Sequence, residues 1–331
     1  MHILKGYTKQ EISWMMYDWA NSAHSVIIVT LLPIFFDTVA GYTADSVSSM
    51  STWGYATSIA MLIVALAAPF LGVFGDIRGM RKKLFSFFML LGVAACAGMA
   101  FTPGMDFTSG PVAAGKVATL ILVLYIVSVI GFDASAIYYD AFLTDVTIED
   151  RMDKVSTMGY GLGYIGGSTI PLLIFLIMNL VGVPMLTCLA FVFGLTAVWW
   201  LAFSLPLLKN CEQTSGKPYE KGDVARSIKG VGTTIKEIIA NKPMLIYILS
   251  YFFYIDGVHT VISMATTYGT NLGLDSTGMM LALLLVQILG LPFCLLYIKC
   301  SEKFGARTMV GFGICVYMFI CIFAFFMNSL W

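Results

Sequence analysis

Apolar runs of membrane-spanning length recur along the whole 331-residue chain. A helix rises about 1.5 Å per residue, so about 20 mostly apolar residues cross the hydrocarbon layer of a bilayer. A helix satisfies its own backbone hydrogen bonds in lipid, whereas barrel strands would alternate in hydrophobicity over about 10 residues. We therefore predict an all-α membrane protein with about nine spans, near residues 13–36, 51–75, 83–101, 117–142, 155–179, 184–208, 243–268, 278–299 and 308–329.

The composition agrees with a lipid solvent. Hydrophobic residues make up 59% of the chain and charged residues 11%, and the mean hydropathy is +0.86. Water-soluble domains carry about 25% charged residues. The formal net charge is zero and no basic tail is present, so we exclude a nucleic-acid partner. The seven cysteines lack C-x-x-C spacing, and we expect no metal and no cofactor.

Lysine and arginine placement predicts the orientation. If the N-terminus is cytoplasmic, every one of the 19 basic residues except Lys116 falls on the cytoplasmic side. Basic residues concentrate in cytoplasmic loops, so this orientation is expected. The first apolar run carries Asp18, Asn21 and His24 and lacks a small-residue cleavage site, so we interpret it as a retained span in the inner (cell) membrane.

One long polar connection follows the sixth span, which suggests two halves. We assign residues 1–208 to an N-terminal six-helix half, 209–242 to a cytoplasmic linker, and 243–331 to a partial C-terminal half of three helices. The second turn of each half has an acid, a glycine three residues later and an arginine two residues after that. These residues are Asp76, Gly79 and Arg81 in the first copy, which Gly72 precedes, and Glu302, Gly305 and Arg307 in the second. Parallel repeats of this kind occur in facilitator-type transporters.

We interpret the two repeated turns as a cytoplasmic gate. Glycine permits a positive φ or a close backbone approach, and a carboxylate can accept charge-assisted bonds from a nearby arginine or helix N-terminus. For the basic residues Arg81, Lys82 and Lys83 the alternative is a topology signal alone.

Ionisable residues inside the apolar runs are few. They are Asp18 and His24 in the first span, Asp133 and Asp140 in the fourth, and Asp256 and His259 in the seventh; Asn21 accompanies the first pair. A charge at the bilayer centre costs at least about 2.5 kcal/mol, so each is a functional hypothesis. They recur every third span, and in a facilitator-type architecture those spans would line a shared central cavity.

Two roles are open for these residues. A desolvated carboxylate or a histidine can exchange a proton near neutral pH, which would couple solute movement to a proton gradient. Alternatively, the carboxylates bind the amino group of a zwitterion or another cation. A buried polar cluster that only fixes helix packing is the remaining interpretation.

The fifth span opens with a glycine ladder. Gly159, Gly163 and Gly167 stand four residues apart, a small-xxx-small pattern that lets another helix approach closely. We interpret the ladder as helix packing, and the alternative is backbone that lines the cavity.

Several motifs together resemble a known family. Residues 17–23 (Tyr-Asp-Trp-Ala-Asn-Ser-Ala), 139–145, 159–167 and 256–258 are similar to motifs of the family that contains the autophagy-related vacuolar amino-acid effluxer, within the major facilitator superfamily. The resemblance implies a major facilitator fold of twelve helices, alternating access between two halves, and a small solute such as an amino acid. Asp140 departs from the asparagine that is usual there, and Thr144 from proline.

The resemblance leaves rival functions open. About three spans of the family pattern are missing after residue 331, so we keep a non-transporting remnant or a subunit of a membrane complex as the alternative. A membrane enzyme is a second rival, but the chain shows no nucleophile motif such as G-x-S-x-G. We predict a secondary transporter of small polar solutes in a lipid bilayer.

Overall fold

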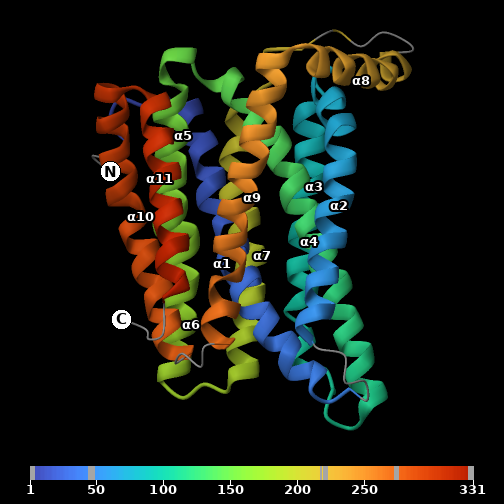
Figure 1. The fold of residues 1–331 in the computed structure, drawn as a ribbon. Helices are drawn as coiled ribbons and strands as arrows, with labels where there is room; N and C mark the ends of the chain where they lie inside the picture. The colour runs from blue at the N-terminus through green and yellow to red at the C-terminus, as the bar shows by residue number, and fades with distance from the viewer. Residues whose placement is uncertain (1–3, 44–48, 217, 219–222, 272–275, 327–331) are drawn as a thin grey trace. The chain divides into compact units, whose positions relative to one another are not determined.

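The computed structural model describes residues 4–43, 49–216, 218, 223–271 and 276–326 (Figure 1). Contacts divide the chain into two compact units, Met1–Glu220 and Lys221–Trp331. The first unit contains α1 (Lys9–Ala40), α2 (Ser49–Gly75), α3 (Arg81–Met99), a 3-10 turn η1 (Thr102–Gly104), α4 (Pro111–Val146), α5 (Glu149–Gly163), a π-helical segment η2 (Tyr164–Thr169), α6 (Ile170–Leu180) and α7 (Met185–Asn210).

The second unit contains four helices in its described residues. They are α8 (Asp223–Ala240), α9 (Lys242–Asn271), α10 (Ser276–Phe304) and α11 (Ala306–Phe325). Within this unit α9 packs against α8, α10 and α11.

Nine helical stretches in the described ranges are long and apolar enough to span a membrane. Each coincides with one of the predicted apolar runs, although the bounds differ by a few residues. Some stretches are longer than predicted, as in Lys9–Ala40 and Pro111–Val146, and others end earlier, as in Lys242–Ile262. The prediction of an all-α membrane protein with about nine spans is therefore confirmed.

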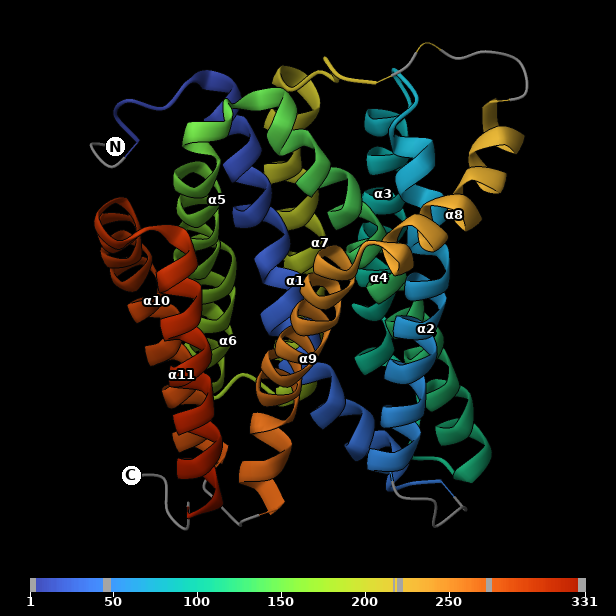
Figure 2. The same cartoon turned by 45° about the horizontal axis from the view of Figure 1, so that its top comes forward.

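Helix α1 is the central element of the first unit (Figure 2). It contacts α4, α5 and α7, and its largest side chains, such as Trp14, Tyr17 and Phe35, are almost fully buried. Its start is fixed by a capping box, in which Thr8 and Glu11 each bond the backbone N–H of the other. Polar residues on α1 are consequently held inside the helix bundle, away from lipid.

Helices α3 and α4 approach each other closely at a glycine pair. A Cβ on Gly131 would lie 2.5 Å from the backbone nitrogen of Gly92, and a Cβ on Gly92 would lie 2.5 Å from the Trp200 ring of α7. Only glycine fits at either position, because any larger side chain would push these helices apart.

The predicted span 155–179 is a helix with a change of pitch. The chain runs from α5 through the π-helical segment Tyr164–Thr169 into α6. Such π segments are uncommon and often lie at functional sites. The glycine-rich sequence there supplies little side-chain packing to favour the regular α-helical pitch.

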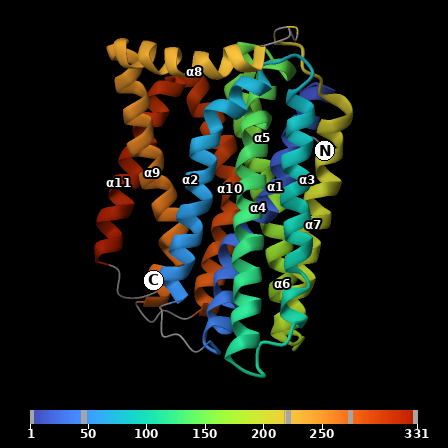
Figure 3. The ribbon, with the colours of Figure 1, turned by 90° about the vertical axis from the view of Figure 1, so that its right-hand side faces the viewer.

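The polar segment 209–242 is more ordered than a simple linker. Helix α7 continues to Asn210, and residues 223–240 form α8, which lies across the end of α9 in both Figure 1 and Figure 3. Charged residues interrupt the apolar run here, so a search for membrane-length hydrophobic stretches does not find this helix.

Candidate functional site

Asp18 of α1 is buried among aromatic side chains of α1 and α4. The Tyr139 hydroxyl donates to Asp18 Oδ2 over 2.7 Å. Tyr139 is itself held by Trp14, whose indole N–H donates to the Tyr139 carbonyl over 2.8 Å and whose ring stacks on the tyrosine ring at 4.3 Å. In the described part of the chain no ion pair involves Asp18. Its carboxylate is therefore oriented by a neutral donor and keeps its negative charge uncompensated when ionised.

The glycine ladder of α5 lies against this part of α1. A Cβ on Gly163 would lie 2.5 Å from the Ser22 hydroxyl, one on Gly167 would lie 2.6 Å from the Trp19 carbonyl, and one on Gly159 would collide with the Asp18 carboxylate. The ladder thus allows α5 and η2 to pack directly beside Asp18.

His24 and Asn21 lie further along α1 and are both buried. The His24 Nε2 lies 3.2 Å from the Ser128 hydroxyl, and its ring stacks on Phe132 at 4.8 Å, so it contacts α4. Asn21 interacts with the Tyr17 hydroxyl, which also bonds Ser135 over 2.8 Å. These contacts join α1 to α4, a geometry that favours the packing role for His24.

Asp133 and Asp140 share one face of α4. Seven residues separate them, which is about 10 Å along a helix. Asp133 is half-buried and its Oδ2 has no hydrogen-bond partner among the described residues. Asp140 is exposed and lies close enough to Asp18 for the two carboxylates to repel. The first unit therefore brings Asp18, Tyr139 and Asp140 together, with Asp133 about two turns away.

Asp256 and His259 lie on α9 in the second unit, and both are exposed. No hydrogen bond joins their two side chains in the described residues, although their spacing on the helix would permit one.

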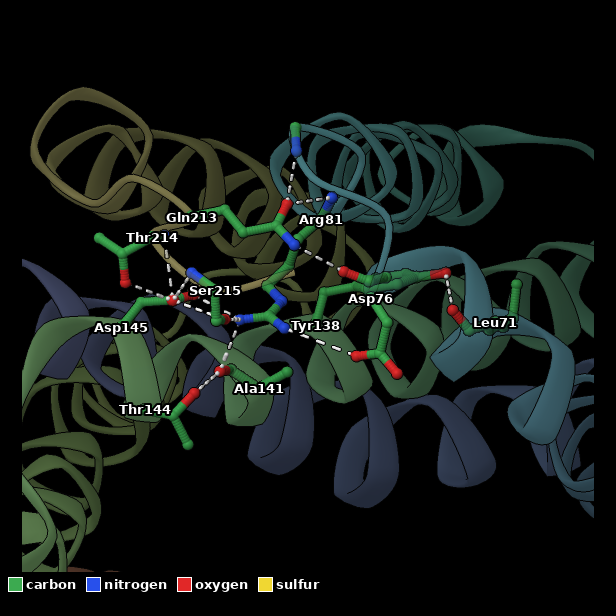
Figure 4. A network of polar contacts seen from close by, with 12 residues as sticks. Leu71, Asp76, Arg81, Tyr138, Ala141, Thr144, Asp145, Gln213, Thr214 and Ser215 are labelled. Atoms are coloured by element: carbon green, nitrogen blue, oxygen red, sulfur yellow. Dashed lines mark hydrogen bonds and ion pairs between the residues drawn. The ribbon is translucent and has the colours of Figure 1, made fainter. Parts of the chain in front are cut away.

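Arg81 at the start of α3 organises the turn between α2 and α3 (Figure 4). Its guanidinium forms an ion pair with the buried carboxylate of Asp145 on α4 and donates to the Ala141 carbonyl over 3.0 Å. Asp76, the acid singled out by the repeat, lies 3.7 Å from Arg81 and is 81% exposed. The close partner of Arg81 is thus Asp145, which sequence spacing did not assign.

The segment after α7 closes over this ion pair. Asp145 Oδ1 accepts bonds from the backbone and hydroxyl groups of Thr214 and Ser215, at 2.8–3.0 Å. The Gln213 side chain accepts from the backbone N–H groups of Gly79 and Arg81 and donates to the Gly75 carbonyl over 2.9 Å. We call Arg81, Asp145, Gln213, Thr214 and Ser215 the clasp.

The turn residues themselves have distinct roles. Gly79 has φ +80°, a left-handed conformation that glycine adopts without strain, while Gly72 supplies the carbonyl that accepts from the Asp76 N–H over 3.1 Å. Lys82 and Lys83 form no ion pair in the described ranges, so the clasp involves Arg81 and not its basic neighbours.

The second copy of the turn lies between α10 and α11. Gly305 has φ +83°, nearly the value of Gly79, and immediately precedes α11. Glu302 and Arg307 are exposed within this unit. The two aligned glycines thus share a backbone conformation that other residues resist.

Sequence reasoning missed a second charged contact. Arg151 of α5 binds Glu11 of α1 with two bonds of 2.9 and 2.8 Å, and Thr147 also donates to Glu11, over 2.7 Å. Glu11 is buried, so this bidentate pair fixes the ends of three helices. The Thr8-x-x-Glu11 spacing, which is typical of a capping box, is a sequence signal that could have marked Glu11.

Comparison with known proteins assigns the fold to a family. The family model described as "Vacuole effluxer Atg22 like" matches residues 39–330, most of the chain. The chain belongs to this family. The Atg22-like chain is also 39% identical over 335 residues to an uncharacterized MFS-type transporter of Bacillus subtilis, covering 99% of this chain and 76% of the relative. It is therefore a transporter of the major facilitator type.

More distant relatives are similar over a part of their length. Autophagy-related protein 22-1 of Penicillium rubens is 24% identical over 188 residues, which cover 53% of the Atg22-like chain and 32% of the relative. Among solved structures, the xylose transporter XylE of E. coli, in a partially occluded inward-open conformation, gives a TM-score of 0.49 at 14% identity, with 90% and 73% of the two chains covered.

Proposed function

We propose that this protein is a secondary transporter of small polar solutes with a cationic group, amino acids above all, working by alternating access. The observation that carries the proposal is the buried Asp18 carboxylate, which has a neutral donor in Tyr139 and no cationic partner among the described residues. The description of the family as vacuole effluxers supports transport. The unpaired carboxylate of Asp18 supports a solute that carries a cationic group.

The cationic group of the solute would supply the missing charge. An isolated carboxylate inside a membrane is costly, whereas a paired one can be stabilised by a nearby ammonium group. Asp140 directly follows Tyr139 and is near enough to Asp18 for the two charges to interact, and Asp133 offers a further acceptor about two turns from Asp140. A solute passing along this face of α4 would therefore meet three carboxylates in succession.

Protonation is the second way to neutralise these carboxylates. A proton and a solute ammonium group compete for the same oxygen atoms, so release of one favours binding of the other. This competition would couple solute movement to a proton gradient. We also propose that Asp256 of α9 binds the solute or a proton during transport.

The clasp is proposed as the cytoplasmic gate. Its ion pair and surrounding hydrogen bonds tie the α2–α3 turn, the end of α4 and the segment after α7 together. The proposed orientation, with the N-terminus in the cytoplasm of a cell membrane, puts the clasp on the inner face. Opening it would release these elements as the halves rock, with the Gly305 turn as the counterpart in the second unit.

Proteoliposome uptake of a radiolabelled amino-acid mixture tests the proposal. Replacing Asp18 by Asn keeps the hydrogen bond from Tyr139 but removes the charge. A charge-assisted bond contributes about 1.5–3 kcal/mol, so uptake should fall about 10- to 100-fold. The matched control is Asp106→Asn, on a loop where Asp106 bonds only Thr108 and Ser109, and its uptake should equal wild type.

Protein folding must be measured alongside uptake. Both variants should unfold at the wild-type temperature in detergent, so that a loss of uptake reports on solute binding. Wild-type uptake by Asp18→Asn would refute the role of Asp18, and an absence of uptake by wild-type protein for every amino acid would refute the solute class.

A further inference from the structure

Helix α8 is amphipathic, and part of its apolar face is exposed in the described residues of the second unit. In the sequence, aliphatic residues of this 18-residue helix stand at positions 224, 228, 231, 235, 238 and 239, all within one stripe at helical spacing. Of these, Ile235 is 49% exposed and Ile239 59% exposed. Thr233, on the opposite side of the helix, and Lys236, at the border of the stripe, are exposed as well.

The helix has weak intrinsic stability. Gly230, Gly232, Thr233 and Thr234 stand in its middle, and glycine and β-branched residues are poor helix formers. Most of the stability of a helix in a protein comes from packing of its amphipathic face and not from its intrinsic propensity. A surface that covers the aliphatic stripe is therefore needed to keep α8 helical.

The position of α8 in the chain indicates which surface this is. Helix α8 ends at Ala240 and α9, a candidate membrane span, begins at Lys242, so a single residue connects them. Since the start of a transmembrane helix lies at the membrane surface, the end of α8 lies there too. The two helices run in different directions, α8 across the end of α9 (Figures 1 and 3).

The charge of this region fits an anionic surface. Residues 217–242 contain six basic residues and three acidic ones. Each lysine or arginine close to an anionic leaflet contributes about 1 kcal/mol of attraction. A helix with an aliphatic stripe and basic polar residues characteristically lies in the interface, with the stripe among the upper acyl chains.

We propose that α8 lies flat in the surface of an anionic leaflet, with Ile235 and Ile239 inserted between the lipids and Lys236 among the headgroups. The connection between the two units is then a membrane-bound element, not a free linker. Movement of the units would drag α8 along or through the headgroup layer, so the lipid charge would influence the transport cycle.

Spin labels on the full-length chain in lipid nanodiscs test this proposal. Single cysteines replace Ile235, Ile239, Thr233 or Lys236 in a background in which the seven native cysteines are changed to alanine, and collisions with oxygen and with a water-soluble nickel chelate are measured. Labels at positions 235 and 239 should collide mainly with oxygen, the label at 233 mainly with nickel, and the label at 236, at the border of the stripe, with both. Protection of 235 and 239 from both reagents would show that protein covers the stripe, and nickel access to both faces would put α8 in water; either result overturns the proposal.

A second measurement uses the chain with its native cysteines and without spin labels. Trypsin cleavage within 223–240 should be slow in nanodiscs containing about 30% phosphatidylglycerol and faster in nanodiscs of phosphatidylcholine alone, because the anionic lipid retains the basic helix. Lys236→Glu should narrow this difference, whereas Thr233→Ser should leave it unchanged. Equal cleavage rates in the two lipids would contradict the anionic partner. Neither measurement depends on solute transport, so it is independent of the proposed function.

Discussion

Asp145 and Asp18 are two largely buried carboxylates with opposite surroundings. Asp145 is paired with Arg81 and accepts four bonds from Thr214 and Ser215, whereas among the described residues Asp18 accepts one bond, from Tyr139. The first is satisfied by the protein and holds three elements together. The second is oriented but not neutralised. The comparison teaches that burial alone does not identify a functional carboxylate, and that the count of partners separates a structural acid from a candidate binding acid.

Removing the cation from the clasp should have the largest effect on stability. Arg81→Ala leaves the Asp145 charge buried without its partner, which destabilises proteins by about 3–5 kcal/mol. The measurement is thermal or denaturant unfolding in detergent. Arg78→Ala, in the same turn and in no ion pair of the described residues, is the control and should change stability by less than about 0.5 kcal/mol. Equal effects of the two substitutions would remove the distinction between Asp145 and Asp18.

Crowding the Asp18 site should have the next largest effect. In Gly159→Ala the new methyl group collides with the Asp18 carboxylate and would lie 3.3 Å from the Trp14 ring. Overpacking of this kind costs about 1–3 kcal/mol. Gly115→Ala, on α4 with open space around its Cβ, should instead stabilise the chain by about 0.4–1 kcal/mol. A stabilised Gly159→Ala variant would show that α5 does not pack on Asp18 as described.

Removing the single donor to Asp18 should have the smallest effect. Tyr139→Phe deletes one hydroxyl and keeps the aromatic ring that stacks on Trp14, so unfolding should cost about 1–2 kcal/mol less free energy than in wild type. Uptake should fall further than the loss of folded protein would explain, because the Asp18 carboxylate is no longer held in its orientation. Tyr138→Phe is the neighbouring control, whose hydroxyl donates only to the Leu71 carbonyl, over 3.0 Å. Normal uptake by Tyr139→Phe would show that Asp18 needs no positioning group.

Local rules account for the parts of the fold that the sequence predicted. The nine spans followed from hydrophobic length, because lipid admits only helices there. The positive φ at Gly79 is one of the two roles, with a close backbone approach, that the repeated glycine in a short charged turn suggested. The fold class and transporter family were predictable for the same reason, since motif residues such as Asp18 and Asn21 stand at short, fixed spacings.

Long-range partners were not predictable in this way. Asp145 and Ser215 lie 64 and 134 residues from Arg81, and no spacing rule connects residues so far apart. The bidentate Glu11–Arg151 pair was unpredictable for the same reason, because its residues are 140 apart. Helix α8 escaped prediction because its apolar residues form a stripe rather than a continuous run.

The sequence by itself determined which segments are membrane helices and which few acids they contain, because the cost of exposing polar backbone or charge to lipid depends on local composition. Only the tertiary structure decided that Arg81 forms an ion pair with Asp145, while Asp18 accepts a hydrogen bond only from the Tyr139 hydroxyl among the described residues. That choice depends on which helix faces meet, and the meeting is set by packing at positions such as Gly92, Gly131 and Gly159, where the absence of a side chain lets helices approach.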